Sequence, residues 1–175
     1  MKIAIIGYSG CGQSTLAEAL SHKLQLPVLY LDTVHHLPGW QARDRSDTRR
    51  IVGEFLDQND SVGWVIDGNY GRQHFQRRME EADAIVLLRF PRLVCLYRAW
   101  KRYRTFKGRV RPSMTAGCEE KLDAEFVRWI LWKGPKNHSA LFQEVLETYG
   151  DKVTVLRNQR QLDAYYRAQG LNAKL

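Results

Sequence analysis

A run of small residues near the N-terminus has the spacing of a phosphate-binding loop. Gly7 to Thr15 reads G-Y-S-G-C-G-Q-S-T, and it directly follows an apolar segment. Glycines allow the backbone to curl so that several N–H groups face one anion, and a helix that begins there adds partial positive charge. The pattern G-x-x-x-x-G-K-[ST] binds nucleotide phosphates in this way, and Ser14 has the hydroxyl that meets Mg²⁺. The alternative is a glycine turn without a ligand.

Position 13 departs from this pattern, because Gln13 stands where a phosphate-binding lysine is expected. Glutamine donates a hydrogen bond without a charge, and charge-assisted hydrogen bonds are roughly twice as strong as neutral ones. We therefore expect weakened triphosphate binding or slowed transfer, unless an arginine replaces the lysine. Cys11 is expected to be a small loop residue, with a redox role as the alternative because helix N-termini lower the pKa of thiols.

Two carboxylates follow short apolar strands. Asp67 ends the segment Trp64–Ile66, and Asp32 ends Val28–Leu31. From such a position Asp67 is expected to hold Mg²⁺, directly or through water. Asp32 is expected to orient or deprotonate the hydroxyl of a phosphoryl acceptor. A turn or helix-cap role is the alternative for both residues.

The net charge of +8 is concentrated in one segment. Residues 84–118 contain nine lysines and arginines and no acid, so the rest of the chain is close to neutral. A field this local attracts polyanions, either nucleotide phosphates in a closed site or a nucleic-acid backbone on an open face. A solvated helix face is the alternative, although solvated helices usually mix the two signs.

Length and composition limit the class of protein. The 175 residues are 44% hydrophobic and 26% charged, which fits one globular domain and argues against disorder or a coiled coil. No apolar run approaches the roughly 20 residues of a membrane helix, so no membrane partner is expected. Three widely separated cysteines do not form a disulfide framework, and a cytoplasmic location is expected.

Strands and helices are expected to alternate along the chain. The expected strands are Lys2–Ile6, Val28–Leu31, Trp64–Ile66, Ala84–Leu88 and Val153–Leu156. The expected helices are Ser14–Leu24, Thr48–Leu56, Gly71–Glu81, Pro91–Phe106, Leu122–Trp132, Ala140–Tyr149 and Gln161–Gln169, with loops over Thr33–Asp44 and Gly108–Gly117. In the helix after Pro91, the side chains expected to face inward are Leu93, Leu96, Tyr97, Trp100 and Tyr103.

This alternation predicts an α/β fold: a three-layer P-loop NTPase architecture with about five parallel strands and helices on both faces. Residues 1–175 then form one domain, with a small basic helical lid inserted around residues 98–128. Ligands of such sheets bind beyond the carboxyl ends of the strands. The glycine loop, Asp32 and Asp67 are all expected at that edge, where lid arginines would neutralise the charge of a triphosphate.

Several sequence blocks resemble a known family. These blocks are Leu31-Asp32, Leu37-Pro38-Gly39-Trp40, Trp64-Val65-Ile66-Asp67-Gly68-Asn69-Tyr70, Phe90-Pro91-Arg92, Gly108-Arg109-Val110-Arg111-Pro112 and the stretch from Gly117 to Trp129. Together with Leu156-Arg157, they resemble the adenylate-kinase-related bacterial family described as DNA topology modulation proteins. Asp67-Gly68 followed by Arg72 is also similar to a strand end of adenylate kinases. The resemblance implies a P-loop kinase fold over nearly the whole chain, and Gln13 departs from the family's usual lysine.

The sequence thus predicts a nucleotide-binding protein, with an ATP-dependent phosphotransferase as the first hypothesis. Asp32, Asp67, Arg109 and Arg111 are the candidate catalytic residues, and Ser14 and Asp67 the candidate Mg²⁺ ligands. The candidate ATP-binding residues are Gly7, Ser9, Gly10, Cys11, Gly12, Gln13, Ser14, Thr15, Arg102 and Arg157. The residues expected near an unidentified small-molecule acceptor are His35, Trp40, Asn69, Arg72, Arg98 and Arg128. A nucleotide sensor that has lost transfer, and a nucleic-acid binder that uses residues 84–118, are the alternatives; no nucleic-acid-binding motif supports the latter.

Overall fold

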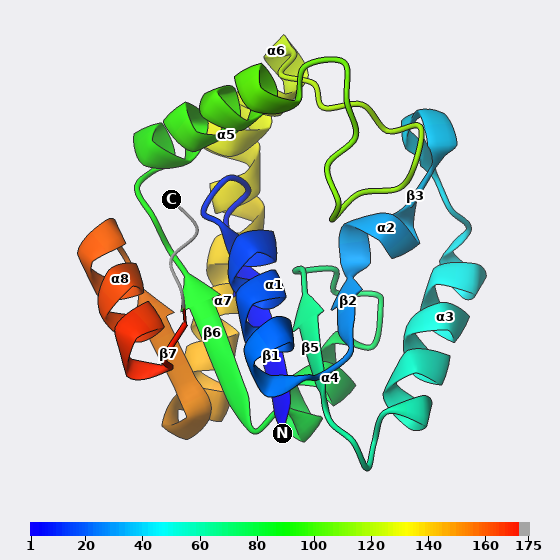
Figure 1. The fold of residues 1–175 in the computed structure, drawn as a ribbon, viewed down its shortest axis with the longest axis vertical. Helices are drawn as coiled ribbons and strands as arrows, with labels where there is room; N and C mark the ends of the chain where they lie inside the picture. Colours follow the sequence, from blue (N-terminus) through cyan, green and yellow to red (C-terminus); the bar gives the residue numbers. More distant parts are fainter. Residues whose placement is uncertain (172–175) are drawn as a thin grey trace.

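The computed structural model describes residues 1–171 and is built on a parallel five-stranded sheet (Figure 1). The strands lie in the order β2-β5-β1-β6-β7. Their bounds are β1 Lys2–Gly7, β2 Val28–Tyr30, β5 Trp64–Asp67, β6 Ala84–Leu88 and β7 Val153–Leu156. The predicted α/β fold class is confirmed, and each of the five expected strands forms within one residue of its expected bounds.

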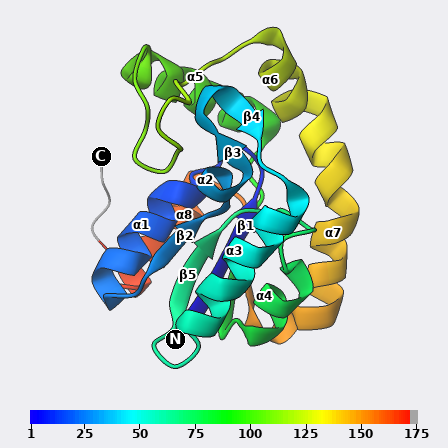
Figure 2. The same ribbon diagram turned by 90° about the vertical axis from the view of Figure 1, so that its right-hand side faces the viewer.

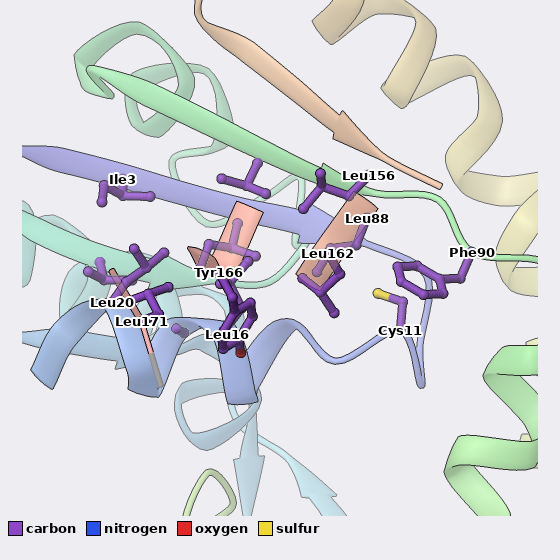
Figure 3. Close-up of a cluster of buried hydrophobic side chains, with 14 of the residues drawn as sticks. Ile3, Cys11, Leu16, Leu20, Leu88, Phe90, Leu156, Leu162, Tyr166 and Leu171 are labelled. Atoms are coloured by element: carbon purple, nitrogen blue, oxygen red, sulfur yellow. The ribbon is translucent and has the colours of Figure 1, made fainter. Parts of the chain in front are cut away.

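Helices cover both faces of the sheet because the strands are apolar on both sides. In β1, Ile3 and Ile5 pack into one core cluster, while Ala4 and Ile6 pack into the other. The first cluster lies under α1 (Gln13–Leu24) and α8 (Gln159–Ala168), as Figure 3 shows for the side chains beside the strands. The second lies under α3 (Arg45–Gln58), α4 (Phe75–Glu81) and α7 (Gly134–Tyr149), and Figure 2 shows α1 and α7 on opposite sides.

The segment after β2 is not the loop that the sequence analysis expected. It contains α2 (Leu31–His35), a 3-10 turn at Pro38–Trp40, and a two-stranded hairpin of β3 (His36–Leu37) and β4 (Gln41–Ala42). These elements are too short to produce a hydrophobic period in the sequence. Burial of Leu31 and Val34 against the sheet fixes the segment instead.

Several helix boundaries differ from the expected ones. The short helix α6 (Ala124–Arg128), a π-helical turn (Trp129–Lys133) and α7 follow one another without a loop, whereas two separate helices, Leu122–Trp132 and Ala140–Tyr149, were expected. Pro135 lies in the first turn of α7, directly after the π-turn. A π-turn leaves backbone groups unpaired in the normal register, so the missing N–H of proline costs less there. The helix expected from Gly71 begins only at Phe75.

Helix α5 (Arg92–Phe106) forms as expected, and Leu96 packs against the core as predicted, but Leu93, Tyr97 and Trp100 do not face inward. Leu93 and Tyr97 are 74% and 60% exposed, whereas Cys95 and Ala99 are buried. The reason is close packing: a Cβ added to Gly10 of the glycine loop would lie 2.5 Å from the carbonyl oxygen of Cys95. Small side chains are therefore needed where α5 meets the loop, and Leu93, Tyr97 and Trp100 face outward.

Among residues 1–171, no helix is long and apolar enough to cross a bilayer.

Candidate functional site

The loop between β1 and α1 has the open conformation that an anion needs. Gly10 and Gly12 have φ angles of 86° and 99°, a region that side chains other than glycine rarely adopt. Gly12 is the N-cap of α1 and has no side chain to accept from the first N–H groups of the helix. These donors are the partial positive end of the helix, so the loop can hold a phosphate without rearrangement.

Side chains from three other segments hold this loop in place. The Asn69 amide accepts from the Gly7 N–H at 2.9 Å and donates to the Gly7 carbonyl at 2.7 Å. The Trp129 indole N–H donates to the Ser9 hydroxyl at 3.2 Å. Arg98 donates to the Cys11 carbonyl at 2.7 Å, lies over the Phe90 ring and also contacts Gln159. The loop is therefore preorganised by the segment after β5, by α5 and by the π-helical turn that contains Trp129.

Ser14 and Asp67 meet at the carboxyl end of the central strands. The Ser14 hydroxyl donates to Oδ2 of Asp67 at 2.7 Å, while the buried Oδ1 has no hydrogen-bond partner among the described residues. Burial raises the pKa of Asp67 to about 7, against the opposing effect of the Ser14 hydrogen bond. A hydroxyl and a free carboxylate oxygen are hard oxygen donors, which Mg²⁺ prefers, so these residues fit such an ion.

Gln13 occupies the place of the expected lysine. Its side-chain nitrogen is buried and has no hydrogen-bond partner among residues 1–171. It lies so close to the loop that a Cβ added to Gly7 would be 2.9 Å from it. An unpaired buried donor costs free energy unless a ligand satisfies it. A Cβ added to Gly12 would lie 3.7 Å from a guanidinium nitrogen of Arg98, so a cation does reach the loop from α5.

A network of carboxylates and arginines lies beside Asp67. Asp32 accepts from the Tyr70 hydroxyl at 2.7 Å and from Arg111 at 3.1 Å. The buried Glu120 forms an ion pair with Arg102 at 2.7 Å and with Arg111 at 3.7 Å. Two of the nine basic residues of segment 84–118 are thus neutralised within the protein, on the side of the loop that faces Asp32.

The loop between α5 and α6 is fastened to the segment after β2 (Figure 1). The Thr115 hydroxyl donates to the His36 carbonyl at 2.7 Å, and the Trp40 indole donates to the Glu119 carbonyl at 3.1 Å. The Gly39 N–H donates to the Gly117 carbonyl at 3.0 Å. These contacts bring Arg111 and Asp32 together although they are 79 residues apart in sequence.

The structure separates the predicted site residues into two groups. The residues of the glycine loop, Ser14, Asp32, Asp67, Asn69, Arg98, Arg102 and Arg111 lie together, and the His35 ring contacts Tyr70. The side chains of Thr15, Arg72, Arg109, Arg128 and Arg157 are exposed, and Trp40 contacts the loop between α5 and α6 at Glu119. No finding tests their roles, so these assignments stay predictions.

Three residues of the network were missed by sequence reasoning. Tyr70 and Glu120 bond directly to predicted residues, and Arg78 is fully buried, where it donates to the backbone carbonyls of Gln73, Gly68 and Tyr70. Burial lowers the pKa of Arg78 to about 9. Glu120 follows Glu119 in an acidic pair, and nothing in the pattern distinguishes the buried carboxylate from the exposed one.

Comparisons with known structures show which proteins share this fold. A shikimate kinase from Acinetobacter baumannii in complex with shikimate is similar at a TM-score of 0.59 and 16% identity, over 97% of this chain and 93% of that one. A deoxyadenosine kinase from M. mycoides with bound dATP is similar at a TM-score of 0.53 and 14% identity, over 97% and 100% of the two chains. No protein-family model and no curated protein matches the chain. The protein therefore has the α/β fold of the P-loop kinases.

Proposed function

We propose that this protein binds Mg·ATP on the glycine loop and transfers its γ-phosphoryl group to a hydroxyl of a small-molecule acceptor. The observation that carries the proposal is the Ser14–Asp67 pair, with one free buried carboxylate oxygen, at the open N-terminus of α1. Similarity to kinases named for shikimate and deoxyadenosine supports the fold on which this chemistry depends. The protein is thus an ATP-dependent kinase in this proposal.

The proposed roles follow from position. The N–H groups of Gly10 to Thr15 bind phosphate oxygens, and Ser14 and Asp67 hold Mg²⁺. The bound Mg²⁺ would neutralise charge on the phosphates during transfer. Arg98 approaches the loop from α5 and brings a positive charge beside Gly12, although it does not occupy the position of Gln13.

The acceptor is proposed to bind near Asp32, on the far side of Asp67 from α8. Asp32 would accept the proton of the attacking hydroxyl, and the hydrogen bond from Tyr70 and the ion pair with Arg111 orient its carboxylate. His35 beside Tyr70 and the exposed Arg72 are candidates for acceptor contacts. We also propose that residues 98–128 act as a lid of a single domain, bringing Arg102 and Arg111 to the phosphates.

Calorimetric titration of Mg·ATP into the unmodified protein tests the proposal first. We expect a dissociation constant in the micromolar range, weakened about tenfold by Ser14→Ala because one metal ligand is lost. Ser61→Ala, which removes an exposed hydroxyl from the turn before β5, is the matched control and should leave the affinity unchanged. An absence of binding up to millimolar ATP would contradict the proposal.

Gln13 provides a second candidate function, a nucleotide sensor without transfer, because its unpaired amide carries no charge. A screen of nucleosides, nucleotides and small alcohols for ADP formation separates the two functions. Production of ADP that depends on one acceptor supports the kinase, and nucleotide binding without turnover on any acceptor supports the sensor.

Gln13→Lys is expected to strengthen Mg·ATP binding by about 1 kcal/mol or more, which is roughly a fivefold lower dissociation constant. The lysine ammonium would replace a neutral donor next to the phosphates, at a position where the glutamine nitrogen already faces the loop. The measurement is the same titration, with Gln25→Lys at the exposed end of α1 as the charge control. An unchanged affinity would mean that Arg98 already fills this role.

A further inference from the structure

A second hollow lies behind the phosphate loop, on the side of the sheet that α7 covers. It has a volume of about 530 Å³ and opens between the start of α5 and the first turns of α7. The residues that line it include Tyr8, Arg89, Arg92, Trp132, Lys136 and Ser139. Ser14, Asp67 and Asp32 do not line it, so this hollow is separate from the proposed transfer site.

The hollow contains positive charge that the protein does not neutralise. Arg89 from the turn after β6, Arg92 from the start of α5 and Lys136 from α7 line it, and no acidic residue does. Within residues 1–171 none of the three forms an ion pair, in contrast to Arg102 and Arg111 on the other side of the loop. Arg92 uses one nitrogen to donate to the Leu131 carbonyl, which leaves its other donors available. Arginine and lysine in this arrangement favour phosphate groups.

Aromatic side chains form the walls between these cations. Trp132 borders the hollow and is 60% exposed. A ligand that covers this large apolar ring removes it from water, which favours binding. Tyr8, which also lines the hollow, packs on Phe142 at 5.3 Å between ring centroids, and this contact holds its ring in place. The Ser139 hydroxyl donates to the Lys136 carbonyl at 3.1 Å, and its oxygen can still accept a hydrogen bond. Aromatic faces beside guanidinium groups suit a planar ring that carries an anion.

We propose that this hollow is a second binding site, for a small aromatic phosphate of mononucleotide size. Its volume lies within the range of about 300–1,000 Å³ that small-molecule sites occupy. Tyr8 also belongs to the phosphate loop, where its carbonyl accepts from the Cys11 N–H and its own N–H donates to Leu88. A ligand in the hollow therefore contacts the back of the loop. The proposal does not depend on phosphoryl transfer at the Ser14–Asp67 site.

The test uses three probes on the complete chain: AMP, adenosine and inorganic pyrophosphate, followed by calorimetry and tryptophan fluorescence. AMP is expected to bind saturably, and adenosine at least tenfold more weakly because it lacks the anion. Pyrophosphate is expected to bind between the two because it lacks the ring. Lys136→Gln and Arg89→Gln should each weaken AMP binding about tenfold, which corresponds to one charge-assisted hydrogen bond.

Two sets of variants make the outcome decisive. Lys133→Gln removes an exposed charge near the same helix without lining the hollow, and it should change AMP affinity less than twofold. Ser14→Ala and Asp32→Asn alter the proposed transfer site and should leave AMP affinity unchanged, so failure of the two proposals can be told apart. The second site is overturned if AMP does not saturate below millimolar concentrations, if adenosine binds equally well, or if only the transfer-site variants weaken AMP.

Discussion

Asp67→Asn is expected to stabilise the ligand-free protein at pH 8 by about 2 kcal/mol or more and to abolish Mg²⁺-dependent nucleotide binding. The side chain is 7% exposed, and its pKa in the folded protein is raised to about 7 by burial. The ordinary value is 3.8, and each unit of pKa corresponds to about 1.4 kcal/mol. The ionised carboxylate at pH 8 therefore costs the fold on the order of 4 kcal/mol, which a neutral amide of the same shape avoids in large part.

The direction of the pH effect follows from proton binding. Between about pH 4 and pH 7 the folded protein holds a proton on Asp67 that the unfolded chain has already lost. The contribution of the Asp67 carboxyl to the free energy of unfolding is therefore fully present below about pH 4 and is lost as the pH rises through about 7. The unmodified protein is thus expected to lose stability between pH 5 and pH 8, and the variant is expected to lose much less.

Urea unfolding at pH 5 and pH 8, with and without Mg·ATP, measures both effects. Mg²⁺ binds the ionised carboxylate, so Mg·ATP should restore the stability of the unmodified protein at pH 8 and leave the variant unaffected. Asp151→Asn, at an exposed position before β7, is the matched control and should follow the unmodified protein. The same pH dependence in Asp67→Asn and in the control would show that Asp67 does not titrate near neutral pH.

The strands and the meeting of Ser14 with Asp67 could be predicted because each leaves a local signal. Short apolar runs that end at Gly7 and Asp67 indicate buried parallel strands, and the carboxyl ends of such strands share one edge. Their order in the sheet leaves no such signal. β2 pairs with β5, and β1 lies between β5 and β6, through contacts that only the folded chain defines.

The outward face of α5 shows where hydrophobic pattern fails. Leu93, Tyr97 and Trp100 repeat at helical spacing, which predicts a buried stripe, yet they are 74%, 60% and 41% exposed. The inner face instead carries small residues beside the glycine loop and Arg98 and Arg102, which turn toward the site. A face that must approach a backbone and present cations cannot also bury large apolar side chains, and the period alone does not distinguish the two.

Glu120→Ala is expected to lower the free energy of unfolding by about 3 kcal/mol. Besides the effect of Asp67→Asn, this is the largest that we expect. The carboxylate is 4% exposed and joins Arg102 and Arg111, whose side chains are 24% and 13% exposed. Burial lowers the pKa of Arg102, with Arg111 as the next cause, so the two cations repel each other once the carboxylate is removed. Breaking a buried ion pair costs more than forming it gains, because the remaining charges stay out of water without a partner.

Chemical denaturation and hydrogen exchange together check this expectation. Glu119→Ala removes the adjacent, exposed carboxylate and should cost less than about 0.5 kcal/mol. In Glu120→Ala the amides of residues 107–123 should exchange faster, because Glu120 holds both the loop between α5 and α6 through Arg111 and helix α5 through Arg102. Equal stability of the two variants would contradict the expectation and would mean that the arginines reach water once released. Faster exchange without loss of global stability would also contradict it, because the effect of Glu120 would then be confined to this loop.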